Sequence, residues 1–579
     1  MIDFKKDLSF IQGEVDVSES SKDAYSHDAS VFEIRPEVVV FPKNAEDISN
    51  LIKWVNDHKK DNPQLSITMR AAGTCMSGGS INDSIIVDTT KFMNHIVSIR
   101  KTLPYTITPH FYGAKEVVCV GEAIVEPGVM YRDFEKQAEK EGLLLPCYTA
   151  SKSINALGGM VGNNSGGELT LRYGKMEDYV TELKILLQDG HEYTIKPLSR
   201  RELYSKIAQI DFEGELYKTI YNLIKDNESL IRAAKPRVSK NSSGYNLWNA
   251  LSKDGSGEDV FDLSQIIIGA QGTLGVVTQM KLALVEPRKA SSLVVVMMNS
   301  LDSLGELVHE ISKTHPESIE SYDDKTFKLA MRFFKDFVKS KGFWGTFKFA
   351  TQFVPEFFMM LTGGVPKLIV LVEYWADTEE NAKKRSTELL SLIKRFGHTV
   401  RITEDETEAK KYWDMRRDSF ALLRKHIEGK RTAPFIDDII VRPEFLPEFL
   451  PKLNQLFKEY PELVYTIAGH AGNGNFHIIP LMDFNNPKTA EIILTLSEKV
   501  YDLVISYEGS IDAEHNDGII RTPFLKQMFG DHIVHLFEET KNVFDPKRIF
   551  NPRKKVGGTK EDIKKYLIKP DHPAQMHSS

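Results

Sequence analysis

The chain has 579 residues, of which 41% are hydrophobic and 27% charged, and its formal net charge at pH 7 is −7. This length is too great for one hydrophobic core, so we expect two or more domains. The charge balance argues against a dedicated nucleic-acid-binding protein, which would need a large basic surface. The three cysteines, Cys75, Cys119 and Cys147, include no CxxC pair, which argues against a disulfide framework and against a cysteine-based zinc or iron–sulfur site.

The first 18 residues carry two lysines but no apolar core of the kind found in a signal peptide. No uninterrupted apolar run reaches the roughly 20 residues that a membrane-spanning helix needs. These features predict a protein of the reducing cytoplasm.

The N-terminal region predicts a capped helix followed by two strands. Asn44 or its neighbour is placed to cap a helix that runs to about residue 59 and has apolar residues on one face. Strands are expected at residues 65–70 and 85–88, and the loop between them, AAGTCMSGGS, consists mostly of small residues. Such a loop exposes consecutive backbone N–H groups to an anion. It is neither a Rossmann fingerprint nor a Walker loop, because the glycine spacing and the lysine of those motifs are missing.

Two further runs of small residues follow. A strand at residues 117–125 leads through Glu126-Pro127-Gly128 into a helix over about 130–142. The segments ALGGMVGNNSGG (156–167) and IGAQGTLGVV (268–277) then repeat the small-residue composition. A backbone can approach a ligand closely only where side chains are absent or small. Three such loops before residue 280 predict a long, phosphate-bearing cofactor that lies across them.

The composition changes after Glu286-Pro287. The segment SSLVVVMMNS (291–300) begins a strand–helix–strand unit, and LIVLVEYW (368–375) supplies another central strand. We therefore place a domain boundary near residue 290.

Residues 326–362 combine a basic amphipathic pattern with many aromatic residues. Apolar residues recur at helical spacing from Phe327 to Phe337, with Lys328, Arg332 and further basic residues on the opposite side. This pattern can lie on an anionic membrane surface. Alternatively, the segment is an insertion that packs against the second domain with its lysines in solvent. Both interpretations stay open.

The segment GHAGNGNFHII (469–479) predicts a β-hairpin. Asn473-Gly474 between two apolar runs favours a type I′ turn, in which both central residues have positive φ. In that register His470 and His477 stand opposite each other on one face, with Cβ atoms about 5 Å apart. Two imidazoles so placed can share a metal ion if a third ligand is supplied. The alternative is a hairpin with two ordinary histidines.

Five motifs in this order carry a family resemblance. They are Arg70-x-x-Gly-Thr with Ser-Gly-Gly, Glu126-Pro-Gly, Gly158-Gly-Met-x-x-Asn-Asn-Ser-Gly-Gly, Gly269-x-x-Gly-Thr-Leu-Gly-Val and Gly469-His-x-Gly-x-Gly-Asn-x-His. Over most of its length the chain resembles the FAD-linked oxidases of the vanillyl-alcohol-oxidase fold. Among these it most resembles the D-2-hydroxyacid dehydrogenases, a group that includes D-lactate and D-2-hydroxyglutarate dehydrogenases and glycolate oxidase FAD subunits.

The resemblance implies an α+β fold with a PCMH-type FAD-binding domain of two α+β subdomains. It also implies an α+β substrate (cap) domain with an antiparallel sheet, and a C-terminal segment that returns to the FAD domain. We place these at residues 1–288, at 289–505 with the insertion 326–362, and at 506–569, and we expect a disordered tail at 570–579.

The resemblance also implies which residues bind FAD. They are Ala71, Ala72, Gly73, Thr74, Ser77 and Gly78 in the first loop, Gly158, Gly159, Asn163, Ser165 and Gly167 in the second, Gly272, Thr273, Val276 and Val277 in the third, and Asn551 near the end. Some relatives attach FAD covalently through a histidine in the first loop. That place is filled here by Thr74 or Cys75, so we expect non-covalent FAD. Gln271 stands where relatives often carry Glu.

The resemblance assigns a metal site and a catalytic pair. His470, His477 and Glu514 match the ligands of a divalent metal, for which Zn²⁺ is expected and Mn²⁺ or Fe²⁺ are alternatives. His515 matches the catalytic base, and Arg416 matches the residue that clamps the substrate carboxylate, with Arg417 as the fallback. The implied reaction oxidises a 2-hydroxy acid to a 2-oxo acid by hydride transfer to flavin N5. Without the resemblance, Glu514 and His515 would be interpreted as a surface pair.

Departures from the family bear on the substrate. Ile479 and Phe420 replace an Asn and a Thr of some relatives, and this less polar pocket favours D-lactate or a longer monocarboxylate. The run EHNDGIIRTPF (514–524) instead resembles relatives for which 2-hydroxyglutarate is a candidate substrate. Two other functions stay open, an alkylglycerone-phosphate-synthase-like flavin transferase and a non-catalytic flavoprotein subunit. The intact Glu514-His515 pair argues against the subunit.

Oxidation of a 2-hydroxy acid requires an electron acceptor. We expect a quinone, a cytochrome, an electron-transfer flavoprotein or a separate iron–sulfur protein. No nucleic-acid partner is expected. A cytoplasmic location is expected, with peripheral attachment to the inner face of the membrane as the alternative. The sequence leaves the oligomeric state open.

Overall fold

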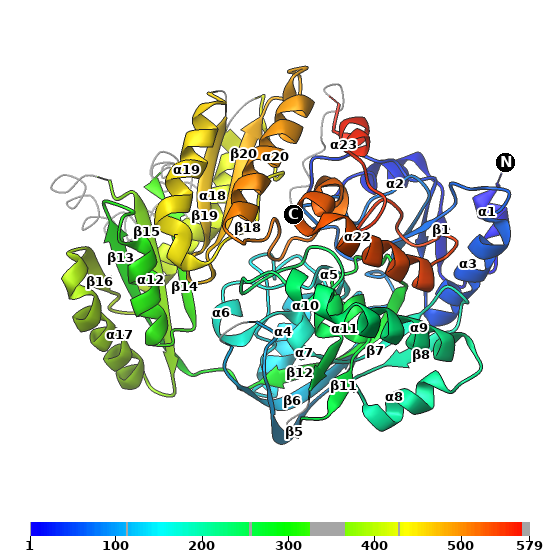
Figure 1. The fold of residues 1–579 in the computed structure, drawn as a ribbon, viewed down its shortest axis with the longest axis horizontal. Coiled ribbons are helices and arrows are strands. Elements are labelled where there is room, and N and C mark those ends of the chain that lie inside the picture. The colour runs from blue at the N-terminus through cyan, green and yellow to red at the C-terminus, as the bar shows by residue number, and fades with distance from the viewer. Residues whose placement is uncertain are drawn as a thin grey trace, which may run out of the picture.

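The computed structural model describes residues 2–111, 114–253, 257–324, 365–426, 429–461 and 463–569, of which 417–426 are described by their backbone alone. The basic aromatic segment 326–362 and the tail 570–579 lie outside the described residues. The described chain forms four sheets in two halves, an N-terminal half with three sheets and a cap half with one (Figure 1).

A mixed four-stranded sheet carries the first small-residue loop. Its elements are α1 (Phe4–Asp7), β1 (Glu14–Asp16), α2 (Glu19–Ala24), β2 (Val38–Phe41), α3 (Ala45–His58), β3 (Ile67–Arg70) and β4 (Ile85–Asp88). The strand order is β1-β2-β4-β3, and β4 runs parallel to both β2 and β3. The Asn44 side chain accepts the N–H of Asp47 and caps α3, whose residues Leu51 and Val55 pack against the sheet. The capped helix and both strands predicted for this region are confirmed.

An antiparallel five-stranded sheet forms the core of the rest of the N-terminal half. Its order is β5 (Ile96–Ile107), β6 (Val117–Val125), β12 (Val276–Val285), β7 (Val180–Leu186) and β8 (Glu192–Ile195). A small sheet of β10 (Leu251–Lys253), β11 (Asp259–Phe261) and β9 (Leu198–Ser199) lies beside it. The helices are α4 (Tyr131–Lys140), α5 (Leu157–Asn163), α6 (Thr170–Tyr173), α7 (Met176–Tyr179), α8 (Arg200–Ile207), α9 (Phe212–Asp226), α10 (Glu228–Ala234) and α11 (Ser264–Ile267).

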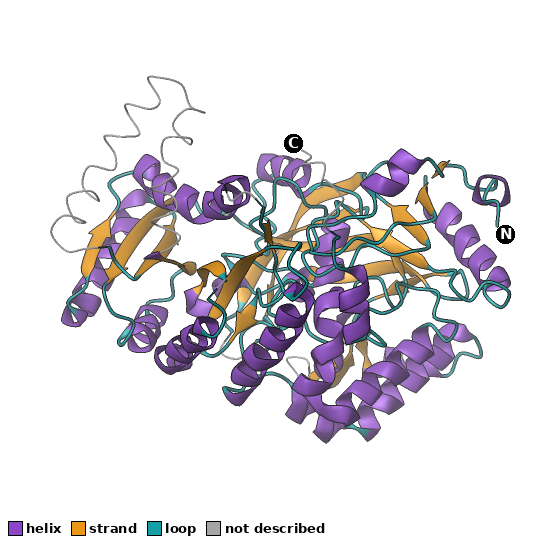
Figure 2. Cartoon of the chain, turned by 90° about the horizontal axis from the view of Figure 1, so that it is seen from above, coloured by secondary structure: helices purple, strands orange, loops and turns teal. Residues whose placement is uncertain are grey.

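The cap half is built on one antiparallel sheet of eight strands. Its strands are β13 (Ala290–Met298), β14 (Ser318–Asp323), β15 (Leu368–Ala376), β16 (Thr399–Ile402), β17 (Arg431–Thr432), β18 (Ile439–Ile440), β19 (Val464–His470) and β20 (Asn475–Met482). Its helices are α12 (Leu304–Lys313), α17 (Glu379–Ile393), α18 (Glu406–His426), α19 (Leu446–Lys458) and α20 (Thr489–Ser506). The order is β16-β13-β15-β14-β19-β20-β17, and β18 pairs with β20. Figure 2 shows the strands of both halves with the helices around them.

Strand alternation gives the cap sheet two different faces. One face, with Val296, Val370 and Ile478, is buried against α12, α17, α19 and α20. On the other face α18 packs against the apolar part of the sheet through Tyr412 and Trp413. The strand register places Glu320, His470 and His477 on this second face, beyond its apolar part. These three polar side chains therefore line the face that α18 covers in part.

The predicted register of the histidine hairpin is wrong. His470 pairs with Asn475, and His477 pairs with Ala468. A single 3₁₀ turn at Ala471–Asn473 ends at Gly474 (φ 71°), whereas the two-residue turn would require positive φ at Asn473 as well, which it does not have. The connecting loop therefore has four residues. Because the shift moves the pairing by two positions, the two imidazoles stay on one face and are diagonal rather than opposite neighbours.

The C-terminal segment returns to the N-terminal half. Its helices α21 (Gly518–Arg521), α22 (Leu525–Phe544) and α23 (Lys560–Tyr566) follow the cap sheet in sequence, and α22 and α23, red in Figure 1, lie over the N-terminal half. Phe550 forms a parallel bridge with Ile67 at the end of the first sheet, and Leu567 bridges Phe32. The fold is thus the α+β architecture expected from the sequence, with a C-terminal return.

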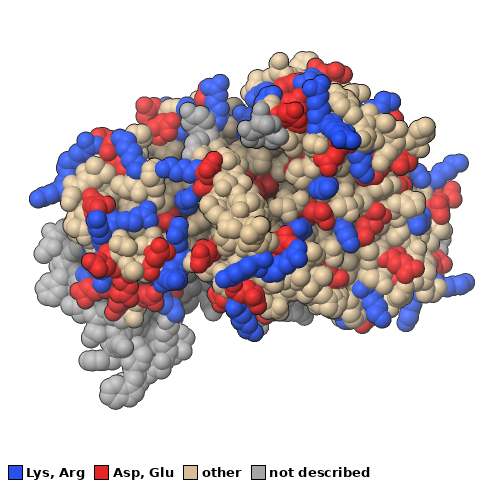
Figure 3. Space-filling view, turned by 90° about the horizontal axis from the view of Figure 1, so that it is seen from below, with Lys and Arg blue, Asp and Glu red and all other residues tan. Residues whose placement is uncertain are grey.

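The surface in Figure 3 shows basic and acidic side chains interspersed, with a hollow between the two halves. Within the described part of the chain, no helix has both the length and the apolar character needed to cross a membrane.

We expect Gly474→Ala to destabilise the protein more than Gly397→Ala. Both glycines have φ near +70°, where an L-residue costs about 1–2 kcal/mol. A Cβ on Gly474 would lie 1.9 Å from the carbonyl oxygen of Val441, whereas no atom lies within 4 Å of one on Gly397. We therefore expect a loss of about 2–5 kcal/mol for Gly474→Ala, because overpacking adds to the conformational cost. Denaturant unfolding measures both, and equal losses would contradict the tight turn.

Candidate active site

The three small-residue loops meet at the centre of the N-terminal half. The Gln271 side-chain amide donates to Ser77 Oγ of the first loop (3.4 Å) and to Asn163 Oδ1 of the second (3.2 Å). Its backbone N–H donates to the carbonyl oxygen of Gly162, also in the second loop (2.9 Å). One residue of the third loop therefore joins all three loops into a single surface.

Parts of this surface stay half-exposed although the neighbouring strands are buried. The half-exposed residues predicted to bind FAD are Ala71, Ala72, Gly73, Thr74, Gly158, Gly159, Asn163, Gly272 and Val277. A Cβ placed on Gly159 would lie 3.5 Å from the Cβ of Ala71, so the first two loops touch where only small groups intervene. Exposed backbone of this kind lets an extended cofactor approach closely. The surface fits FAD.

The other residues predicted to bind FAD are buried and brace the loops. These are Ser77, Gly78, Ser165, Gly167, Thr273, Val276 and Asn551. The Asn551 amide donates to the carbonyl oxygens of Gly79 (2.8 Å) and Gln271 (2.7 Å), so the C-terminal segment ties the first loop to the third. Val276 belongs to the core under the first sheet, where its side chain packs against other apolar residues.

The structure brings the three predicted metal ligands together. Nε2 of His470 lies 3.2 Å, and Nε2 of His477 lies 3.4 Å, from the same oxygen, Oε1 of Glu514. The two imidazole centroids are 5.2 Å apart. Two ligand atoms that each lie about 2.0–2.1 Å from a tetrahedral zinc are roughly 3.3–3.4 Å apart. The donor types and these two nitrogen–oxygen distances therefore fit one divalent metal ion.

His515 lies beside these ligands and shares a carboxylate with one of them. Its ring stacks on that of His477, with centroids 5.0 Å apart. Oδ2 of Asp437 lies 2.7 Å from Nδ1 of His515, and Oδ1 lies 3.3 Å from Nδ1 of His477. The His515 side chain is more exposed (22%) than that of His477 (11%). It is thus the histidine of the group most open to a substrate.

Asp438 fixes the backbone that carries Glu514 and His515. Its Oδ2 accepts the backbone N–H groups of Ala513 (3.0 Å), Glu514 (2.6 Å) and His515 (2.7 Å). Its Oδ1 accepts the side-chain amide of Asn475 (2.9 Å), next to the hairpin turn. One carboxylate therefore joins the hairpin to the segment that carries Glu514 and His515.

Lys240 neutralises the other oxygen of Glu514. Its ammonium group is fully buried and lies 2.9 Å from Glu514 Oε2. A second buried lysine, Lys175, donates to the carbonyl oxygens of Asn241 (2.6 Å) and Ala513 (3.1 Å). These contacts hold Lys240 and the backbone at Asn241 against the segment that carries Glu514.

The electrostatics of the site favour a cation. Burial opposes ionisation of Glu514, but Lys240 and His470 outweigh it and hold the pKa of that carboxyl well below its usual range. Burial opposes a charged His477, but Asp437 and Glu514 raise its pKa to about 10. Burial likewise opposes a charge on His515, yet Asp438 and Asp437 raise its pKa. Positive charge is stabilised at this point whether a proton or a metal ion carries it.

Arg416 reaches the site through another shared carboxylate. It lies on α18 and contacts Glu320, whose other oxygen lies 2.7 Å from Nδ1 of His470. The side chain of its fallback, Arg417, and that of Phe420 lie outside the described residues. Ile479 is buried and lies two residues beyond His477 on the same strand, so both side chains point to the same face of the sheet.

A second possible set of metal ligands shares His477 and Glu514 with the predicted set. In the part of the chain that the structure describes, Asp438, His477, Glu514 and His515 each have one such atom within 4.8 Å of the others. Asp438, however, already accepts four N–H groups. We therefore prefer His470 to Asp438 as the metal ligand.

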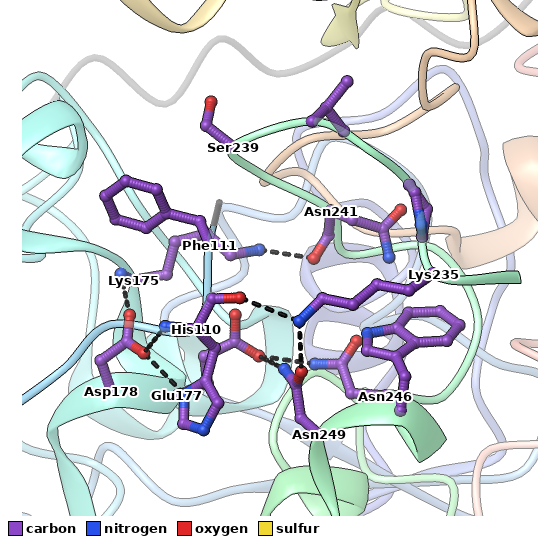
Figure 4. A pocket seen from close by; sticks show the side chains of 13 residues that line it. His110, Phe111, Lys175, Glu177, Asp178, Lys235, Ser239, Asn241, Asn246 and Asn249 are labelled. Carbon is purple, nitrogen blue, oxygen red and sulfur yellow. Dashed lines mark hydrogen bonds and ion pairs between the residues drawn. The ribbon is translucent and has the colours of Figure 1, made fainter. Parts of the chain in front are cut away.

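A separate pocket lies on the N-terminal half near Lys175 (Figure 4). Its charged groups are paired within the wall, since His110 contacts Asp178 (2.8 Å) and Lys235 donates to Asn249 (2.9 Å). Glu177 accepts the amide of Asn246 (2.8 Å). Because these groups satisfy one another, we assign the pocket no ligand.

Sequence reasoning missed Glu320, Asp437, Asp438 and the role of Lys240. Asp437 and Asp438 form a buried acidic dipeptide in FIDDIIV, and Glu320 is a buried acid in the middle of β14. Charged residues are rarely fully buried unless they are paired. For Asp437 and Asp438, acidic residues inside an apolar run were therefore the available signal.

Two protein-family models match the chain. The model described as FAD binding domain matches residues 36–196, and the model described as FAD linked oxidases, C-terminal domain, matches residues 287–555. Together they span most of the chain.

Individual relatives are distant. The chain is 26% identical to the D-2-hydroxyglutarate dehydrogenase of Pseudomonas putida over 94% of its own length and 51% of that protein. It thus spans about half the length of this relative and of three similar ones. It is 24% identical to a D-lactate dehydrogenase of Anaerostipes hadrus, covering 93% of this chain and 94% of that one.

Among solved structures, the 4-ethylphenol oxidase of Gulosibacter chungangensis superposes with a TM-score of 0.65 at 14% identity and covers 96% of this chain and 98% of its own. This likeness shows the fold. The two family models show that the chain belongs to the FAD-linked oxidases, with an FAD binding domain followed by their C-terminal domain.

Proposed function

We propose that the chain is an FAD-dependent dehydrogenase of D-2-hydroxy acids, with non-covalently bound FAD and a divalent metal, and that D-lactate is its preferred substrate class. The observation that carries the proposal is the convergence of His470, His477 and Glu514 beside His515. Relatives named D-2-hydroxyglutarate and D-lactate dehydrogenases support the reaction class. An electron acceptor must regenerate the flavin, and the acceptors expected from the sequence remain part of the proposal.

The reaction removes a hydride from C2 of the substrate and a proton from its hydroxyl group. FAD, when bound, supplies the hydride acceptor, flavin N5. A divalent metal held by His470, His477 and Glu514 would supply a Lewis acid for the hydroxyl oxygen and a positive charge that lowers the pKa of His515.

The chain's own residues supply the remaining roles. His515 takes the hydroxyl proton at one ring nitrogen while its Nδ1 faces Asp437, which orients the ring and stabilises the imidazolium that forms. Arg416 presents a planar guanidinium to the substrate carboxylate, and Glu320 holds it in place. The product is the 2-oxo acid.

Ile479 supports a monocarboxylate substrate. It lies on the same sheet face as His477 and offers no hydrogen bond to a second carboxylate. A buried, unpaired carboxylate is costly. We therefore place D-lactate ahead of D-2-hydroxyglutarate, which remains the alternative because the first relatives carry that name.

An anaerobic screen tests the function. Purified flavoprotein is mixed with D-lactate, L-lactate, D-2-hydroxyglutarate or glycolate, and bleaching of the oxidised flavin absorbance is followed. We expect D-lactate to bleach the flavin fastest and L-lactate not to bleach it. Faster reduction by D-2-hydroxyglutarate would favour the alternative substrate. No reduction by any acid would favour the flavin transferase or the non-catalytic subunit.

Replacement of the base tests the mechanism. His515→Ala is expected to slow flavin reduction by the best substrate about 10²- to 10⁴-fold, because general-base catalysis contributes that much, while FAD stays bound. His535→Ala removes an exposed histidine of α22 and serves as the matched control, with a rate like that of the unmodified protein. Stopped-flow absorbance measures both rates, and unimpaired reduction in His515→Ala would refute the base assignment.

A further inference from the structure

Glu320 is a fully buried acid in the middle of β14, with a side chain only 1% exposed. Its two oxygens face different partners. Oε1 lies 2.7 Å from Nδ1 of His470 on the neighbouring strand, and Oε2 contacts an Nη of Arg416 from α18. A single carboxylate thus bridges a side chain proposed to bind metal and a side chain proposed to bind substrate.

We propose that Glu320 is a positioning residue that couples the metal site to the carboxylate clamp. This proposal rests on the proposed function, because His470 and Arg416 take their roles from it. Through Glu320, the orientation of His470 toward the metal and the orientation of Arg416 toward the substrate depend on one buried group.

The hydrogen bond to Glu320 selects the tautomer of His470. A carboxylate only accepts, so Nδ1 of His470 carries the proton and donates it to Oε1. Nε2 is then left with a lone pair, and this is the nitrogen that lies 3.2 Å from Glu514 Oε1. A histidine held in this way is a stronger ligand, and loss of such a partner typically weakens metal affinity 10- to 100-fold.

Both oxygens of Glu320 are required, because both partners are donors. A glutamine at this position has one accepting oxygen and one donating NH₂ group. Whichever way the amide lies, either His470 or Arg416 then faces a donor. If His470 instead accepts from the amide, its proton moves to Nε2 and blocks the metal-binding nitrogen.

Asp437 provides a natural comparison. It bridges His477 and His515 as Glu320 bridges His470 and Arg416. Each acid therefore links one metal ligand to one residue that handles the substrate. Loss of Asp437 is expected to affect the base and leave the carboxylate clamp intact.

The test compares zinc affinity and steady-state kinetics in FAD-loaded Glu320→Gln and unmodified protein. Zinc affinity is measured by competition with a chromophoric chelator, which does not depend on turnover. We expect the zinc Kd of Glu320→Gln to rise on the order of 10- to 100-fold and its KM for the best 2-hydroxy acid to rise as well. Asp437→Asn is expected to weaken zinc binding and lower kcat without raising KM.

Glu317→Gln is the matched control. Glu317 is also buried and paired with an arginine, but its partners are Arg385 and the backbone N–H of Trp375. We expect this variant to keep the zinc Kd and the KM of the unmodified protein. FAD content and thermal unfolding show that each variant is folded, and Glu320→Asp, whose shorter side chain cannot reach both partners, replaces Glu320→Gln if the latter does not fold.

The outcomes separate this proposal from the proposed function. Unmodified protein that binds neither zinc nor manganese nor ferrous iron would refute the metal site and this proposal together. Zinc binding that is equally tight in Glu320→Gln would overturn the role of Glu320 and leave the proposed function standing. A weakened zinc affinity with an unchanged KM would overturn the coupling to Arg416.

Discussion

The candidate active site depends on one buried carboxylate that holds three successive backbone N–H groups. Asp438 accepts from Ala513, Glu514 and His515, which are far from it in sequence. Hydrogen bonds to a charged acceptor contribute about 1.5–3 kcal/mol each. These three bonds are therefore strong enough to fix a loop that has no regular secondary structure. Asp438 itself has φ of +71°, a conformation that costs about 1–2 kcal/mol for an L-residue. The hydrogen bonds offset this cost.

Around Asp438, the buried charged groups of the site occur in pairs. Glu514 faces two imidazoles with one oxygen and Lys240 with the other, and Glu320 faces His470 and Arg416. Removing one partner of a buried ion pair is strongly destabilising because it leaves an uncompensated charge. The arrangement therefore restricts each side chain to one orientation. That restriction suits the proposed reaction, in which a hydride donor, a base and a carboxylate clamp must be aligned to within a fraction of an ångström.

Local patterns predicted the elements but not the partners that assemble the site. The Asn44-capped helix, the strand at 117–125 and the cap strand at 368–375 are confirmed because capping and hydrophobic runs depend on residues close in sequence. The hairpin register is wrong because Asn473-Gly474 also suits a longer loop with only Gly474 in the left-handed region. The histidines nonetheless share a face, since the two-residue shift preserves strand alternation.

The residues that support the site could not be placed from the sequence. Glu320 meets His470 only because β14 and β19 are neighbours in the sheet, and Asp438 meets Glu514 only because the C-terminal segment returns past the end of β18. No local pattern encodes such pairings. The three small-residue loops could be recognised from the sequence, because a run of small residues signals close backbone approach wherever it lies in the fold.

The central claim is that the hydrogen bonds accepted by Asp438 hold Glu514 and His515 in catalytic position. Stopped-flow flavin reduction in Asp438→Asn tests it most directly, with retained FAD as evidence that the protein is folded. The amide oxygen can still face the three N–H groups, but it is neutral and a weaker acceptor than a carboxylate, and the amide NH₂ then faces the NH₂ of Asn475, so the loop is held less firmly and shifts. Since a misplacement of about 1 Å can cost 10²-fold in rate, we predict that reduction by the best 2-hydroxy acid slows at least about 100-fold while FAD remains bound. Reduction at the rate of the unmodified protein would contradict the account.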